Sequence, residues 1–262
     1  MSFSLPNPKN PLYGNGVFRR RIVYKVEAWG ARIWLFDDFH DMDLAIAVAE
    51  GRVSDISASM RRYPKDTCPG AVAKLQAIRG IEVSNGQAGV RLVDKSRQCT
   101  HLHDLAGLTL SALARRSRDY LAEIYVADED CAGQSIGVAI DGANQLDLIV
   151  KAGTIQMPES MCGSSLGEQF KQSLSSDTNG LKTDVWRMAQ IAYFVSRGRR
   201  WIVDGSPRTR VGEEPAREGA CHSYSRPSFP DSLSMVNYVA NHTDGLPPIT
   251  VVPWHSFEPG TM

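Results

Sequence analysis

The order of apolar and polar residues predicts two groups of β-strands separated by helices. In residues 17–27, apolar and charged side chains alternate with a period of two, which is typical of a half-buried strand. Two further strand-like runs, at 33–36 and 42–48, follow a glycine-containing turn, so the three runs together predict an antiparallel meander. Later alternating runs predict a second group of strands, with a hairpin at "DGAN" joining its last two members: 120–126, 135–140 and 145–151.

Four stretches change to the period of a helix. One covers residues 69–78 and opens with a proline, the residue favoured at the first helical position. Another opens near Thr100, whose hydroxyl suits a helix N-cap, and two more are expected near 163–175 and 183–198. The predicted fold class is α+β, with antiparallel β-sheets (an N-terminal meander plus a later hairpin) packed against about four helices.

Regular patterning ends near residue 205. The chain beyond that point holds eight of the fourteen prolines, and aromatic residues between them argue against full disorder. We therefore expect an N-terminal extension over 1–16, a single α+β domain over 17–204, and a proline-rich C-terminal arm over 205–262 that packs on the body.

Composition narrows the choice of partner. The chain has 29 basic and 29 acidic residues, so no charge excess favours nucleic acid or an anionic membrane. No apolar stretch is long enough to cross a bilayer, and no signal-like segment opens the chain. These features predict a cytoplasmic protein that binds a small molecule, with assembly into a homo-oligomer left open. Five cysteines without a C-x-x-C spacing indicate reduced thiols rather than a disulfide framework.

Two short segments carry a family resemblance. Residues 62–71, "RYPKDTCPGA", contain the pattern Arg-x-Pro-x-x-x-Cys-Pro-Gly-Ala, and "CTHL" begins at Cys99. The pair resembles a bacterial family of unknown function, and the likeness extends over residues 17–204. Some relatives are associated with the catabolism of lignin-derived aromatic compounds, where they release formaldehyde from aromatic dimers without a cofactor. Lys65 departs from the family pattern, which commonly has an aromatic residue there, and the departure suggests a changed substrate pocket.

The resemblance implies a cofactor-independent lyase acting on a phenolic, lignin-derived aromatic substrate through a quinone-methide-like intermediate. His101 is the candidate base, because Asp104 follows at i+3 on the same helical surface and a carboxylate can orient an imidazole. The alternative is that both residues only cap the helix and interact with its dipole. His40, in an earlier "HD" pair, is a second acid–base candidate.

The basic residues before residue 69 are candidates for binding a phenolate or carboxylate, although a solvated basic loop has the same composition. The predicted substrate-binding residues, one of them in the C-terminal arm, are Arg62, Tyr63, Lys65 and Trp254.

Two other functions remain open from the sequence. Cys68, Cys99 and His101 could hold a metal or an iron–sulfur cluster in an accessory or scaffold protein, although both cysteines also suit an apolar core. A non-catalytic protein that binds aromatic acids is the other alternative. In the lyase hypothesis no residue is a metal ligand and no cofactor is needed.

Overall fold

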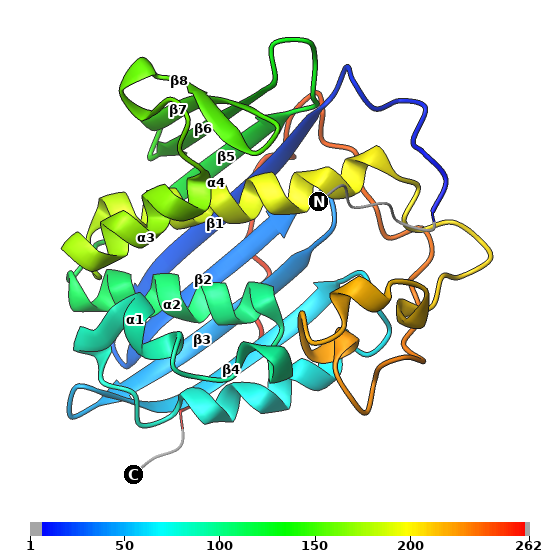
Figure 1. The fold of residues 1–262 in the computed structure, drawn as a ribbon. Coiled ribbons are helices and arrows are strands. Elements are labelled where there is room, and N and C mark those ends of the chain that lie inside the picture. The colour runs from blue at the N-terminus through cyan, green and yellow to red at the C-terminus, as the bar shows by residue number, and fades with distance from the viewer. Residues whose placement is uncertain (1–6, 260–262) are drawn as a thin grey trace.

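A single antiparallel sheet of eight strands runs through the molecule (Figure 1). The computed structural model describes residues 7–259, and the strands lie in the order β4-β3-β2-β1-β5-β6-β7-β8. Their bounds are β1 Val17–Glu27, β2 Gly30–Asp37, β3 Asp41–Ala49, β4 Arg52–Arg62, β5 Tyr120–Ala127, β6 Gln134–Ile140, β7 Ala143–Lys151 and β8 Thr154–Met157. The predicted α+β class, with an N-terminal meander and a later hairpin, is confirmed.

The two predicted groups of strands belong to the same sheet. Strand β1 pairs with β5, with Val17 opposite Ala127 and Tyr24 opposite Tyr120. At the predicted hairpin between β6 and β7, Asp141 and Gly142 have positive φ angles of 49° and 77°, as a tight two-residue turn requires. The pairing of β1 with β5 therefore brings residues about a hundred positions apart into one hydrogen-bonded layer.

Strand β4 was not predicted, because its buried residues do not alternate. Val53 and Ile56 are both buried although they stand three positions apart. The pairing of β3 with β4 shifts register between Ala47 and Val48, so one β4 residue has no opposite partner. Such a bulge breaks the period-two pattern by which a strand is recognised in a sequence.

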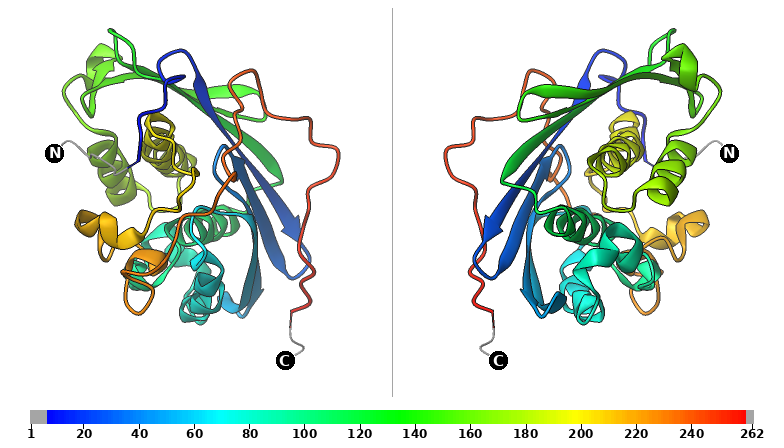
Figure 2. Two further views of the ribbon diagram at one scale, coloured as in Figure 1. Left: turned by 90° about the vertical axis from the view of Figure 1, so that its right-hand side faces the viewer. Right: turned by 90° about the vertical axis from the view of Figure 1, so that its left-hand side faces the viewer.

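The helices lie on one face of the sheet (Figure 2). The α-helices are α1 Gly86–Val90, α2 Thr100–Ala114, α3 Leu166–Ser176 and α4 Leu181–Ser196, and the longest 3-10 helix is η1 Cys68–Ile78. The predicted helices near 100, 163–175 and 183–198 correspond to α2, α3 and α4. Among the described residues, no helix has the length and apolar character that crossing a membrane requires.

The core lies between the sheet and helices α2 and α4. On β3 the buried side chains that face this layer include Met42, Leu44 and Ile46. Helix α2 contributes Leu102 and Leu105, which are almost completely buried, as the predicted apolar stripe of this helix requires. Burial of this apolar layer fixes where the N-terminus of α2 and the C-terminus of α4 lie relative to the sheet.

The chain after residue 204 contacts both sides of the molecule. Residues 205–240 lie on the helix side, where three short 3-10 helices occur: η6 Val211–Glu213, η7 Pro215–Arg217 and η8 His222–Tyr224. The chain then passes the β2–β3 turn, where the Ala240 amide donates to the Asp38 carbonyl, and continues along the opposite face of the sheet (Figure 2). On that face the Arg21 side chain donates to the Pro247 carbonyl and the Arg32 side chain to the His255 carbonyl.

Candidate active site

A cavity of about 200 Å³ opens where β3, α2, α4 and residues 205–240 meet. Much of its wall is apolar or aromatic, including Phe39, Met42, Met60, Phe194, Val195, Trp201, Val203, Tyr224 and Tyr238. Its polar residues include two histidines, three cysteines and the cluster of Lys65, Glu214 and Arg217. A concave apolar site with a few convergent polar groups is the usual form of a small-molecule site.

His40 belongs to the cavity wall and is held by Asp37 in the turn between β2 and β3. The Asp37 Oδ1 atom accepts the backbone N–H groups of Phe39 at 2.7 Å and His40 at 2.8 Å. The same oxygen lies 3.0 Å from Nδ1 of His40, and since a carboxylate only accepts, Nδ1 carries the proton. The Nε2 atom is then an acceptor, and it is buried without a hydrogen-bond partner among the described residues.

Asp37 is itself paired with Arg20 of β1. Both side chains are buried, and the Arg20 Nε atom donates to Asp37 Oδ2 at 2.8 Å. Burial alone would raise the pKa of Asp37, but the charges of Arg20 and His40 outweigh it and hold that pKa well below its usual value. Asp37 therefore stays ionised and can stabilise a protonated His40.

His101, the second residue of α2, lies against His40. The two ring centroids are 3.9 Å apart, and His101 is also part of the cavity wall. Burial lowers the pKa of His101 well below 6.5, and the positive charges of His40, when it is protonated, and of Arg20 lower it further. His101 is therefore neutral at physiological pH.

Asp104, predicted to orient His101, has a different partner. Its Oδ1 atom accepts from Nε of Arg187 at 3.0 Å, and Arg187 belongs to α4. No hydrogen bond joins Asp104 to His101 within residues 7–259, and Asp104 is not part of the cavity wall. The i,i+3 spacing left the choice of partner open, and packing of α2 on α4 brought a guanidinium to this carboxylate. The carboxylate that holds a histidine at the site is Asp37.

Of the four predicted substrate-binding residues, only Lys65 lines the cavity. Arg62 instead donates to the backbone carbonyls of Asp37, at 2.5 Å, and His40, at 3.2 Å. Arg62 thus fixes the turn that carries His40, and its role is to position that residue. Tyr63 is half-buried and is not in the wall.

Trp254 is also outside the cavity, because its part of the chain lies on the other face of the sheet. The next residue, His255, donates its backbone N–H to Asp43 of β3 at 3.1 Å, and its ring contacts the same carboxylate. On β3, Asp43 alternates with Met42 and Leu44, which face the helices. The structure therefore does not bring Trp254 to this cavity.

Three cysteines, Cys68, Cys99 and Cys221, share the cavity wall. Burial raises the pKa of Cys68 to about 11 and raises that of Cys99 further, even though both lie at helix starts. These two thiols are therefore protonated and poorly nucleophilic. Within residues 7–259 no group of three His, Cys, Asp or Glu side chains has the arrangement of a metal site, so Cys68, Cys99 and His101 do not form the predicted ligand set.

The cluster of Lys65, Glu214 and Arg217 forms another part of the wall. The Arg217 side chain donates to Glu214 Oε2 at 2.8 Å, and Lys65 Nζ is 3.7 Å from Glu214 Oε1. Tyr224 donates its hydroxyl to the same oxygen at 3.0 Å. Sequence inspection missed Glu214 and Arg217, since nothing local in the arm marks them, whereas the Asp-x-x-His spacing of Asp37 and His40 was a usable pattern.

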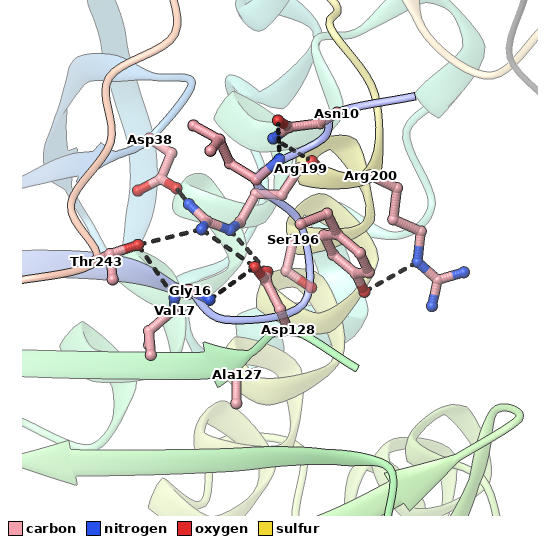
Figure 3. A network of polar contacts seen from close by, with 12 residues as sticks. Asn10, Gly16, Val17, Asp38, Ala127, Asp128, Ser196, Arg199, Arg200 and Thr243 are labelled. Carbon is pink, nitrogen blue, oxygen red and sulfur yellow. Dashed lines mark hydrogen bonds and ion pairs between the residues drawn. The ribbon is translucent and has the colours of Figure 1, made fainter. Parts of the chain in front are cut away.

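A polar junction beside the β2–β3 turn joins five segments of the chain (Figure 3). The Arg199 side chain, just after α4, donates to Asp38 at 2.6 Å, to Asp128 at 2.9 Å and to Thr243 at 3.2 Å. Asp128 also accepts the backbone N–H of Gly16 at 3.0 Å. The junction therefore ties the start of β1, the end of β5 and the C-terminal chain to the turn that carries His40.

The fold and this cavity define an α+β protein with two adjacent histidines in the wall of a site of ligand size. Residues 18–115 match the family described as "Protein of unknown function (DUF2889)". This range contains β1 except its first residue, β2–β4, both motif segments, Asp37, His40 and His101, but not the wall formed by residues 205–240. Comparison with curated proteins gave no match to the chain. The match agrees with a family of unknown function and assigns no activity.

Proposed function

We propose that this protein is a cofactor-independent lyase that acts on a phenolic aromatic compound in the cavity. The observation that carries the proposal is the Asp37–His40–His101 arrangement at the wall of an apolar pocket. A histidine whose Nδ1 atom is held by a carboxylate has its Nε2 atom free to accept a proton. The lignin-derived substrate class and the release of formaldehyde come from the resemblance described above.

The chemistry requires a base and a dry site. In a phenolic substrate with a hydroxymethyl side chain, loss of the phenolic proton together with a leaving group on the carbon next to the ring gives a quinone methide. The base then takes the hydroxyl proton, and the bond to the hydroxymethyl carbon breaks to release formaldehyde. The electron pair of that bond forms a side-chain double bond and restores the aromatic phenolate, which takes the proton back from the base. The substrate is its own electron sink, and apolar walls protect the intermediate from water.

His40 takes the role of the base in this scheme. Asp37 stabilises the imidazolium that forms, in the way a buried carboxylate does for a catalytic histidine. His101 lies beside His40, with 3.9 Å between the ring centroids, and as a neutral ring it can contact the substrate by a hydrogen bond without adding a second positive charge to the site. Phe39, Met42 and Met60 supply apolar wall beside the pair.

Formaldehyde release from a phenolic dimer with a hydroxymethyl side chain tests the proposal. We expect His40→Ala and His101→Ala to lower turnover roughly a hundredfold or more while ligand still binds. The matched control is His103→Ala, because His103 is buried on the same helix but does not line the cavity. Equal and mild effects from all three folded variants would contradict the proposal.

A protein that binds aromatic acids without converting them is the second candidate. The basic residues that share the cavity with the apolar wall favour it, since they suit an anionic ligand. Ligand binding without formaldehyde release would select this candidate over the lyase.

A further inference from the structure

Lys65 is a buried cation in the cavity wall. Its position follows from a short β-bridge between its backbone and Ser234, which holds residues 205–240 against the chain that leaves β4. The Lys65 Nζ atom donates to Ser234 Oγ at 3.0 Å, and the residue is only 8% exposed. Buried lysines are rare unless an anion compensates them, so the charges around this one are informative.

The surrounding charges do not balance. Lys65 and Arg217 are both basic, and both have Glu214 as their carboxylate partner. Glu214 is the only acidic side chain among the described residues that line the cavity. Two cations that share one carboxylate leave one positive charge uncompensated. The Arg217 side chain is 28% exposed and reaches water, whereas Lys65 is buried, where the cost of an unpaired charge is high.

The donors at this place also exceed the acceptors. Arg217 carries five N–H donors and Lys65 three, whereas the Glu214 carboxylate already accepts from Arg217 and from the Tyr224 hydroxyl. Tyr224 has the Arg217 guanidinium 4.4 Å and the Lys65 ammonium 5.6 Å from its ring centroid. An aromatic face next to two cations suits a ligand that is flat and anionic at one end.

We infer that Lys65 and Arg217 form an anion subsite, so that the ligand of this cavity is an aromatic compound carrying a carboxylate. Glu214 holds the two cations in place and reduces their excess to a single charge, which one carboxylate neutralises. The inference rests on the proposed function only for the aromatic character of the ligand. It assigns the choice of substrate to Lys65, inside the segment that matches the family, together with Glu214 and Arg217, which lie outside it.

A matched pair of probes isolates the charge. 4-Hydroxybenzoate and 4-hydroxybenzamide have nearly the same shape, and only the former is anionic at neutral pH. By titration calorimetry with the full chain, we expect the acid to bind about tenfold or more tightly than the amide. Equal affinities, or no measurable binding of the acid at millimolar concentration, would overturn the inference.

Two variants move the charge in opposite directions. Lys65→Met replaces the ammonium group with an uncharged side chain of similar volume and leaves Arg217 and Glu214 as a neutral pair. We therefore expect it to abolish the preference for the acid, while the affinity for the amide stays within about twofold. Glu214→Gln raises the excess to two charges, and we expect the acid to bind as tightly or more tightly. A merely structural cluster would instead lower the affinity for both probes alike, and thermal unfolding of each variant checks that it is folded.

The calorimetry reads binding and not turnover, so its outcome is separate from that of the lyase proposal. His40→Ala protein should still prefer the acid over the amide. Loss of that preference in His40→Ala would place the anion at the histidines and overturn the assignment to Lys65 and Arg217.

Discussion

The two ends of the cavity are built differently. The histidine end (Asp37, His40 and His101) is formed by β2, the β2–β3 turn and α2. A buried ion pair between Asp37 and Arg20 of β1 holds it in place. The cation end (Lys65, Glu214 and Arg217) depends on a segment with only short 3-10 helices and a small apolar cluster of its own: Val211, Tyr224 and Phe229.

This difference separates reactivity from selection. Groups that move protons need fixed geometry, which hydrogen-bonded strands and a packed helix provide. Groups that select a ligand can stand on irregular chain laid over the scaffold, where sequence changes cost little. A change confined to residues 205–240 can therefore alter the ligand and leave the Asp37–His40 pair intact.

The largest expected effect comes from breaking the buried Arg20–Asp37 ion pair at the histidine end. Asp37→Asn leaves the buried Arg20 guanidinium without its anion, so we expect the free energy of unfolding to fall by about 3–5 kcal/mol in urea denaturation. Asp231→Asn is the control, because the Asp231–Arg210 pair is exposed and should contribute at most about 0.5 kcal/mol. If Asp37→Asn lowers the free energy of unfolding by less than about 1 kcal/mol, the ion pair does not stabilise this end of the cavity.

Amide hydrogen exchange compares the two ends directly. Amides of residues 205–240, such as Val211, which bonds to the Ser232 carbonyl at 2.9 Å, should exchange at least about a hundredfold faster than those of β2 and β3. The reason is that the segment opens locally, whereas the strands open with the whole sheet. 4-Hydroxybenzoate should slow exchange in 205–240. Equal exchange rates in residues 205–240 and in β2 and β3 would contradict the difference in local stability between the two ends.

The low pKa of His101 predicts a loss of stability in acid. Above pH 6.5 the His101 ring is neutral in both the folded and the unfolded state. Below pH 6.5 the unfolded chain takes up a proton that the folded site resists, so the free energy of unfolding falls as the pH is lowered. One such histidine accounts for about 1.4 kcal/mol between pH 7.5 and 5.5. Because other groups also titrate in this range, the free energy of unfolding is measured against pH for both wild type and His101→Gln. The variant should lack the part of the decrease that comes from His101. Identical pH profiles would argue that His101 is not held neutral.

The smallest effect is expected on the face opposite the cavity. His255→Ala removes a ring that contacts Asp43, but Arg61 still donates to that carboxylate at 2.6 Å, so we expect a cost of about 1 kcal/mol. Affinity for 4-hydroxybenzoate should stay within about twofold. A clear weakening of acid binding would mean that the two faces of the sheet are coupled.

Most of the regular elements could be predicted, because the apolar residues of each recur with the period of a strand or a helix. The alternation in 17–27 and the Asp141–Gly142 turn gave strands and a hairpin where the structure has β1 and β6–β7. Two strands were not predicted: β8, which has only four residues, and β4, which contains a bulge and whose buried residues stand three apart. A register shift depends on the neighbouring strand, which a single sequence segment does not reveal.

The site was predicted only in part. His40, His101 and Lys65 were chosen as candidates, and all three line the cavity. Their partners were not: the spacing suggested Asp104 for His101, whereas Asp104 pairs with Arg187 of α4. Glu214 and Arg217 lie in a stretch without periodicity, where no local pattern distinguishes them from other surface charges.

The sequence by itself determined the period of each element and the side chains that each can bury, because backbone geometry relates residues no more than about four positions apart. Only the tertiary structure decided which side chains meet. The pairing of β1 with β2 joined Arg20 to Asp37, the packing of α2 on the sheet brought His101 to His40, and the bridge to Ser234 set Lys65 beside Glu214. The physical reason is that apolar burial orients whole elements, and polar side chains then pair with whatever charge that packing places within reach.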